Sequence, residues 1–346
     1  RVLVIQSDNH EAYNNLAGAL ARQDMLSEAE ASYRQALALN PDYAEAYGNL
    51  GAVLASQGRL EEAEVCYRRA LMLKPDYAYA HSNLLFALNY HPDKSGEEIY
   101  AAYREYDAKF GLPHREKWRF HGNSRDAMRR LKVGYVSPDY YSHSVRHFLE
   151  PLLAHHDKRV VEVCAYAEWV QEDAVTERYK RYVDHWVPTR GLPDDALAER
   201  IRADGIDILV DLAGHTENNR LAVFARKPAP VSVSWLGYGY TTGLTAIDYF
   251  LTDDACVPPG SEPLFSEMPW RLATPGYAYR PAEGMGDISP LPAPAKGYVT
   301  FGTLSRSVRI NHRTIRVWAA LLKRVGGSRL VIDSRNFKEV ATQDAL

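Results

Sequence analysis

The feature that most constrains this chain is an internal repeat in its first third, with a period of about 34 residues. A fixed period of this length is typical of an array in which each repeat is one supersecondary unit stacked on its neighbours. Small alanines allow helices to pack closely, and a proline can end one unit and begin the next helix. The residues that recur at this spacing are Ala12, Ala46 and Ala80; Asn15-Leu16, Asn49-Leu50 and Asn83-Leu84; Tyr33 and Tyr67; Ala36-Leu37 and Ala70-Leu71; and Pro41 and Pro75.

The repeat resembles the tetratricopeptide repeat, a helix–turn–helix unit with the same period. Gly58 is expected between the two helices of its unit, and an α-solenoid is predicted over residues 1–90. Such arrays present a concave face to peptides, although a purely structural or dimerising role is the alternative. Residues 91–130 lose the period, and Ser95-Gly96-Glu97-Glu98 indicates a helix start within this linking helical segment.

Strand-like and helical patterns then alternate over residues 131–288, which is typical of a parallel sheet covered by helices on both faces. We expect a doubly wound, Rossmann-like domain here. The expected strands are 132–136, 160–166, 206–210, 231–235 and 249–251, and the clearest expected helices are 174–183 and 193–204.

Polar and glycine-containing loops follow three of these strands. His143 follows the first strand, Gly214-His215-Thr216 follows the run that ends at Asp211-Leu212, and Leu236-Gly237-Tyr238 follows the run that ends at Trp235. The carboxyl ends of parallel strands share one edge of the sheet, where ligands bind in doubly wound folds. A histidine there is suited to accept a proton near neutral pH, and glycine permits close approach of the backbone to a ligand.

Two neighbours of His143 have alternative interpretations. His147 is expected one turn later on the same helix face, where it either contacts the ligand or is an ordinary helix residue. Asp139 either orients a histidine or caps the following helix through backbone amides, and we favour the cap.

Residues 289–297 are rich in proline and are predicted to form an interdomain linker. A second alternating domain is expected to begin at residues 298–346, with Arg306 and Arg309 after its first strand and a helix near 314–324. Arginines beside a helix amino terminus suit a phosphate-containing ligand, although a solvated basic turn is the alternative. Only about two strands fit before Leu346, so we expect the second half to be truncated.

The composition of the chain indicates its cellular compartment and argues against several kinds of binding site. The three cysteines lie far apart and lack metal-ligand spacing, which favours a reducing compartment and argues against a disulfide scaffold or zinc site. A net charge of −3 gives no indication of nucleic-acid binding, and no apolar run of eighteen residues occurs. The apolar run at residues 1–5 is shorter than the core expected of a signal peptide. No Asp-x-Asp pair, which could hold a divalent metal ion, occurs in the sequence. We expect a cytoplasmic protein without a membrane or nucleic-acid partner, and with no metal or other cofactor.

The repeats followed by VGYVSPDYYSHSVRH, LAGHT and KPAPVSVSWLGYGYTTG resemble the protein O-linked N-acetylglucosamine transferases, and their bacterial members in particular. The resemblance implies a GT-B type fold of two facing Rossmann-like halves. It also implies inverting, metal-independent transfer of N-acetylglucosamine from UDP-GlcNAc to Ser or Thr hydroxyls of proteins.

The resemblance also implies roles for single residues. It makes His143 the candidate base and places Gly214, His215, Thr216, Leu236, Gly237 and Tyr238 around the sugar and acceptor. Arg306 and Arg309 stand where the family has a glutamine and a lysine that hold the diphosphate, and Gly239 replaces a family proline.

Two other functions stay open. The chain has the features expected of a protein O-fucosyltransferase that uses GDP-fucose, because the segment that reads the base is not in this sequence. It is also compatible with a non-catalytic, peptide-binding repeat scaffold. The expected partners are a nucleotide sugar, a polypeptide acceptor bound through the repeats and a second copy of the chain in a homodimer.

Overall fold

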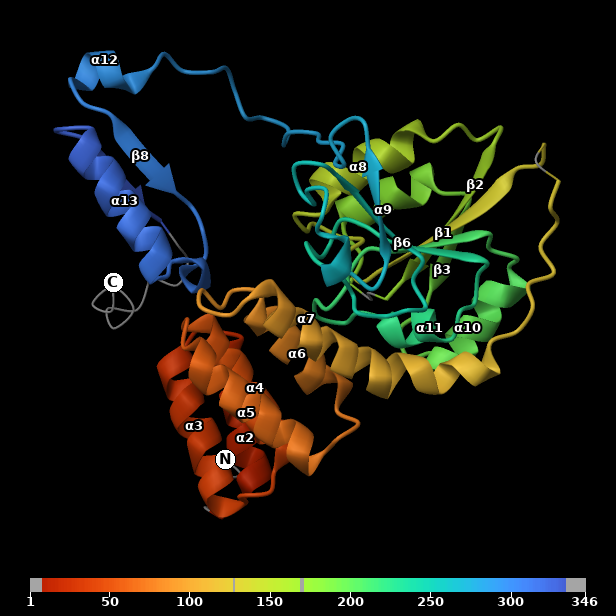
Figure 1. Ribbon diagram of the computed structural model, residues 1–346, viewed down its shortest axis with the longest axis horizontal. Helices are drawn as coiled ribbons and strands as arrows, with labels where there is room; N and C mark the ends of the chain where they lie inside the picture. The colour runs from red at the N-terminus through yellow and green to blue at the C-terminus, as the bar shows by residue number, and fades with distance from the viewer. Residues whose placement is uncertain (1–7, 127, 169–170, 334–346) are drawn as a thin grey trace. The chain divides into compact units, whose positions relative to one another are not determined.

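The computed structural model describes residues 8–126, 128–168 and 171–333. The chain divides into two compact units, one made of residues 1–94 and 286–346 and the other of residues 95–285. Figure 1 shows a helical array at the beginning of the chain and a sheet with helices on both faces in the second unit. The predicted α-solenoid followed by a Rossmann-like parallel sheet is confirmed.

The helical array keeps the period of the sequence, because alternate helices start at equal intervals along the chain. Its helices are α2 (His10–Ala21), α3 (Leu26–Leu39), α4 (Ala44–Ser56), α5 (Leu60–Leu73) and α6 (Ala78–Leu88), and α2, α4 and α6 are equally spaced. Several alanines of these helices are fully buried, and Gly51 packs against the ring of Tyr67, which leaves no room for a Cβ atom. Gly58 has a φ of +83° between α4 and α5, a conformation that favours glycine.

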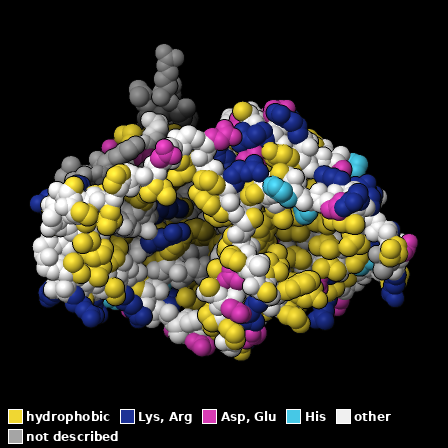
Figure 2. Space-filling model, turned by 90° about the horizontal axis from the view of Figure 1, so that it is seen from above, with side chains coloured by type: hydrophobic (Ala, Val, Ile, Leu, Met, Phe, Trp, Pro, Cys, Tyr) yellow, Lys and Arg dark blue, Asp and Glu magenta, His cyan; other side chains and the backbone are white. Residues whose placement is uncertain are grey.

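The segment after residue 286 forms a β–α–β unit. Strands β8 (Thr300–Thr303) and β9 (Arg329–Ile332) pair in parallel, and α13 (His312–Arg324) connects them. A short helix, α12 (Pro292–Lys296), lies within the predicted linker. Apolar side chains of this unit, such as Val317 and Val331, remain exposed. Figure 2 shows hydrophobic side chains interspersed with Lys and Arg on the face of the molecule that it presents.

The second unit begins with α7 (Gly96–Tyr106), whose start at Ser95 has the capping box that the sequence indicated. A turn of π-helix (Asp107–Gly111) and a 3-10 helix (Leu112–Lys117) follow it. The unit then forms one seven-stranded parallel sheet in the order β3-β2-β1-β4-β5-β6-β7. Its strands are β1 (Leu131–Ser137), β2 (Val161–Ala167), β3 (His185–Pro188), β4 (Ile208–Asp211), β5 (Val231–Ser234), β6 (Tyr249–Asp253) and β7 (Met268–Leu272).

Sequence patterns missed β3 and β7, which are the two edge strands of this sheet. An edge strand buries less of its surface, so neither segment has a continuous apolar run, and β7 contains Pro269, a residue tolerated at sheet edges. The five predicted strands correspond to β1, β2, β4, β5 and β6. The helices of this unit are α8 (Arg146–His155), α9 (Ala174–Tyr182), α10 (Asp194–Ala203) and α11 (Leu221–Ala225), of which α9 and α10 were predicted.

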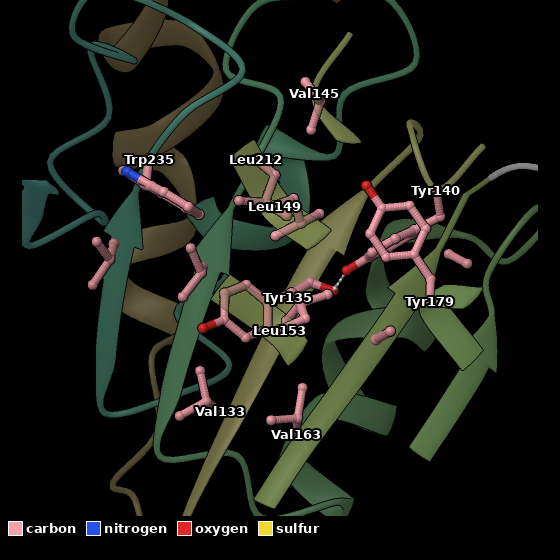
Figure 3. Close-up of a cluster of buried hydrophobic side chains, with 14 of the residues drawn as sticks. Val133, Tyr135, Tyr140, Val145, Leu149, Leu153, Val163, Tyr179, Leu212 and Trp235 are labelled. Atoms are coloured by element: carbon pink, nitrogen blue, oxygen red, sulfur yellow. Dashed lines mark hydrogen bonds between the residues drawn. The ribbon is translucent and has the colours of Figure 1, made fainter. Parts of the chain in front are cut away.

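A cluster of apolar side chains packs α8 and α9 onto one face of the sheet (Figure 3). Leu149 and Leu153 of α8 and Tyr179 of α9 are at most 1% exposed and lie against β1, β2, β4 and β5. Tyr140, at the start of the loop after β1, belongs to this cluster, and its hydroxyl donates to the carbonyl of Tyr135 at 3.0 Å. The core therefore fixes the loop that carries His143.

Among the residues that the structure describes, no helix has both the length and the apolar character needed to cross a membrane.

Candidate active site at the carboxyl edge of the sheet

The candidate site lies where the sheet changes direction. From β1 the chain builds β2 and β3 on one side, and then returns to place β4 and β5 on the other side. In open parallel sheets, connections that leave in opposite directions open a crevice at the carboxyl ends of the adjacent strands. The loops after β1, β4 and β5 meet at this edge, so the structure brings together the three loops that the sequence singled out.

His143 lies in the loop between β1 and α8, and its side chain is 38% exposed. Two residues at the start of α9 hold the loop: Asp173 accepts from the backbone amide of Ser142 at 2.7 Å, and the hydroxyl of Thr176 donates to the carbonyl of Tyr140 at 2.7 Å. The imidazole is thus accessible while its backbone is anchored, which is the combination that a proton acceptor requires.

Asp139 lies beside His143, with its Oδ2 3.7 Å from Nδ1 of the imidazole. Burial raises the pKa of the Asp139 carboxyl, the neighbouring His143 opposes this rise, and Glu217 adds to it. Helix α8 begins at Arg146 with no side-chain cap at Val145, so our preference for Asp139 as the helix cap is wrong. The carboxylate instead lies near the imidazole, at a distance that permits an electrostatic interaction but is longer than a hydrogen bond.

The loop after β4, which contains Glu217, starts beside the end of β1, because the amide of Leu212 donates to the carbonyl of Val136 at 3.1 Å. The hydroxyl of Thr216, in the same loop, donates to the carbonyl of Ala213 at 2.8 Å. This bond folds the loop back on itself.

The loops after β4 and β5 pack into one another through two glycines. Gly214 has a φ of +54°, and a Cβ atom there would lie 2.2 Å from the Cβ of Tyr238. A Cβ atom on Gly237 would lie 1.9 Å from the carbonyl oxygen of Leu212. Leu236, the residue before Gly237, has a φ of +77°, a conformation that strains a non-glycine residue and recurs at ligand sites.

His215 and Tyr238 are buried beneath these loops. His215 is 2% exposed, and its Nε2 lies 2.8 Å from the carbonyl of Thr242. Its ring contacts those of Tyr103 and Tyr106 in α7 and that of Tyr238, and the hydroxyls of Tyr103 and Tyr238 form a hydrogen bond. The predicted substrate contacts of these two side chains stay predictions, and in the structure both support the loops from below.

His147 lies in α8, whereas His143 precedes that helix, so the expectation that both histidines share one helix face is wrong. Nδ1 of His147 lies 3.0 Å from the carbonyl of Arg280, and the amide of Arg280 donates to the carbonyl of His147 at 2.7 Å. The segment after β7 is thereby fastened to α8. A substrate contact by His147 stays a prediction.

Arg306 and Arg309 lie in the turn between β8 and α13, as the sequence predicted, and both are exposed. The guanidinium of Arg309 lies 5.7 Å from the centre of the Tyr90 ring. The side chain of Asn311 accepts from the amides of Arg313 and Thr314 at 3.1 Å, which satisfies two amides of the amino terminus of α13. The guanidinium groups are therefore the principal donors of this turn.

Sequence reasoning missed two buried carboxylates beneath the site. Asp211 ends β4 at 1% exposure, and Glu267 is 3% exposed and accepts from the amide and hydroxyl of Thr242 and the hydroxyl of Thr241. Burial raises the pKa of both carboxyl groups, that of Asp211 to about 6. An aspartate that closes the apolar run of β4 is the sequence signal that could have indicated the first.

Comparison with known proteins agrees with this architecture. The model of glycosyl transferase family 41 matches residues 77–273, which include all three loops, and tetratricopeptide repeat models match residues 25–58 and 44–77. The chain is similar over its whole length to a mutant of the Thermobaculum terrenum O-GlcNAc transferase, with 34% identity, a TM-score of 0.91 and coverage of 65% of that chain.

Curated relatives carry similar names. The chain is 38% identical over 257 residues to the probable UDP-N-acetylglucosamine–peptide N-acetylglucosaminyltransferase SPINDLY of Petunia hybrida, with 73% of this chain and 28% of the relative covered. It is 37% identical over 131 residues to the UDP-N-acetylglucosamine–peptide N-acetylglucosaminyltransferase of Caenorhabditis elegans, with 37% of this chain and 11% of the relative covered. The chain thus spans less than a third of the length of these relatives.

Proposed function

Because the chain belongs to glycosyl transferase family 41, we propose that it transfers N-acetylglucosamine from UDP-GlcNAc to Ser or Thr hydroxyls of proteins. The observation that carries the proposal is the accessible His143, held beside Asp139 in a loop that meets the two nested glycine loops at the carboxyl edge of the sheet. The names of the similar proteins support the donor and the peptide acceptor.

The proposed reaction inverts the sugar carbon. The acceptor oxygen attacks C1 opposite the diphosphate, the bond from C1 to the phosphate oxygen breaks, and UDP leaves with the bonding electrons. The hydroxyl proton passes to His143. The imidazole of His143 accepts this proton, and the carboxylate of Asp139, 3.7 Å from Nδ1, stabilises the resulting imidazolium.

Other groups would bind and orient the substrates. The loops around Gly214 and Gly237 let backbone approach the sugar, and Arg306 and Arg309 would neutralise the departing diphosphate without a metal ion. The helical array would present the polypeptide acceptor, as tetratricopeptide arrays present peptides.

The test is mass spectrometry of Ser/Thr peptides incubated with the intact protein and UDP-GlcNAc in the presence of a metal chelator. We expect a mass gain of one N-acetylglucosamine, reduced at least about a hundredfold in His143→Ala, because general base catalysis typically contributes that much. His155→Ala, at the exposed far end of α8, is the matched control and should retain activity.

Each part of the proposal can fail separately in this experiment. Transfer from GDP-fucose alone would replace the donor, and loss of transfer with chelator would overturn metal independence. Equal rates in His143→Ala and the wild type would remove His143 from the reaction. No transfer from either donor would favour the non-catalytic scaffold.

A further inference from the structure

Asp211 is a buried carboxylate without a cationic partner among the residues that the structure describes. It ends β4 at 1% exposure, and none of the Lys, Arg or His side chains in the described ranges forms an ion pair with it. Its oxygens accept only from neutral donors, namely the amide of Ala213 at 3.1 Å, the amide of Gly214 at 2.9 Å and the hydroxyl of Ser234 at 3.0 Å. An uncompensated buried charge is destabilising, so its presence calls for a reason other than stability.

These hydrogen bonds connect the turn after β4 with the end of β5. The two amides belong to the turn that begins the loop after β4, and the hydroxyl belongs to the last residue of β5. One carboxylate therefore fastens the β4 loop both to its own strand and to the next strand. Hydrogen bonds to an ionised acceptor are about twice as strong as neutral ones, which suits a fastening role.

The fastened turn controls both neighbouring loops. Gly214, which Asp211 holds, is in contact distance of Tyr238 in the loop after β5. Leu212, the residue after Asp211, has its carbonyl against Gly237. On the other side, Asp211 pairs with Val136 near the end of β1, and the amide of Leu212 donates to the carbonyl of Val136 at 3.1 Å. A shift of this turn would therefore be transmitted to each of the three loops.

We propose that Asp211 is a positioning residue for the transfer reaction, which fixes the turn after β4 against β5 so that the loops after β1, β4 and β5 hold the reactive arrangement. The inference rests on the proposed function for its effect on catalysis. Asp211 does not touch a substrate, because its side chain is enclosed, and it acts through the backbone amides that it binds.

The other end of the same strand offers a matched control. Asp207 directly precedes β4, is 6% exposed and is also fully hydrogen-bonded, but its partners are Arg129, Asn123 and the amide of Lys132. Asp207→Asn therefore makes the same chemical change at the amino end of the strand, away from the three loops.

The experiment compares Asp211→Asn, Asp207→Asn and the wild type by steady-state kinetics and by amide hydrogen exchange. Asparagine keeps the volume of the side chain but turns an NH2 group toward the donors of Gly214 or Ser234. We expect kcat to fall about tenfold with KM for UDP-GlcNAc changed less than threefold, because a misplaced turn impairs the reactive arrangement more than binding. The amides of residues 213 and 214 should exchange at least about tenfold faster.

Ser234→Ala removes one donor without changing the charge and should shift both readouts in the same direction by a smaller factor. Asp207→Asn should leave kcat and the exchange of residues 213 and 214 unchanged. Unchanged exchange in Asp211→Asn, or equal loss of kcat in the two asparagine variants, would overturn the role of Asp211. Exchange tests the fastening even if the wild type transfers no sugar, an outcome that would count against the proposed function alone.

Discussion

Strand β4 has an aspartate at each end, and the protein holds the two carboxylates in opposite ways. At the amino end, burial acts to raise the pKa of Asp207, but hydrogen bonds from Arg129, from the Lys132 amide and from Asn123 outweigh it and lower that pKa. At the carboxyl end, burial dominates and raises the pKa of Asp211 to about 6, because its donors are all neutral. Two aspartates that lie four positions apart thus have pKa values shifted in opposite directions.

The two aspartates therefore suit different roles. We infer that Asp207 stabilises the amino edge of the sheet and that Asp211 orders the edge with the proposed site. An ion pair with full hydrogen bonding, as at Asp207, holds the linking segment against the strand start. An acceptor without a cation, as at Asp211, instead orders backbone beside the crevice. Ligands of open parallel sheets bind at the carboxyl edge, so the less stable arrangement lies where function requires precise geometry.

The largest expected effect is that of an alanine substitution at Gly214, compared with the same substitution at Gly205 near the other end of β4. Gly214→Ala places a methyl group 2.2 Å from the Cβ of Tyr238 at a φ of +54°, so the loop must move, and we expect activity to fall about a hundredfold. Gly205→Ala, close to Asp207, also has a positive φ of +67° but meets no atom within 4 Å.

Gly205→Ala should therefore lose about 1 kcal/mol of stability and keep its activity. Transfer assays together with thermal unfolding separate the two results. Comparable activity losses in both variants would show that the edges do not differ.

A smaller effect is expected in the pH dependence of stability. The raised pKa of Asp211 means that its stabilising contribution is complete below its ordinary pKa of 3.8 and is lost as pH rises through about 6. The full change is about 3 kcal/mol, of which about 2 kcal/mol falls between pH 4.5 and pH 7. The free energy of unfolding of the wild type relative to Asp211→Asn should fall by that amount.

Asp207 should behave in the opposite sense. Its lowered pKa gives stability that is present above its ordinary value and lost as pH falls through the lowered pKa. Urea unfolding of the wild type and the two asparagine variants, from pH 7 down to below the ordinary value of 3.8, measures both slopes. Slopes of the same sign would contradict the comparison.

Local patterns made much of this molecule predictable. The regular repeat period fixes the helical array, and apolar runs fix β1, β2, β4, β5 and β6, because both signals lie within short stretches of sequence. The position of His143 at the carboxyl edge follows from the end of β1 alone. The edge strands β3 and β7 escaped prediction because one-sided burial leaves no comparable run.

The buried contacts beneath the site join residues that are far apart in the sequence, so local sequence patterns could not predict them. His215 looks like an exposed loop histidine in the sequence, but Tyr103 and Tyr106, from a helix far earlier in the chain, enclose it. The role of Asp211 requires knowing that Ser234 lies beside it. Asp139 was assigned to a cap because the start of α8 at Arg146, well after Asp139, was not evident.

The smallest expected effect tests whether α7 belongs to the functional edge. Tyr103→Phe removes the buried hydrogen bond between the hydroxyls of Tyr103 and Tyr238, and we expect a loss of about 1 kcal/mol in stability. Because Tyr238 packs on Gly214, we also expect a twofold to threefold fall in kcat. Tyr100→Phe, nearly one turn earlier in α7, removes a weaker bond of 3.3 Å to Ser266 and is the control.

A fall in stability without any change in kcat for Tyr103→Phe would confine α7 to a structural role. A fall in kcat specific to Tyr103 would instead extend the functional edge into the helix that precedes the sheet.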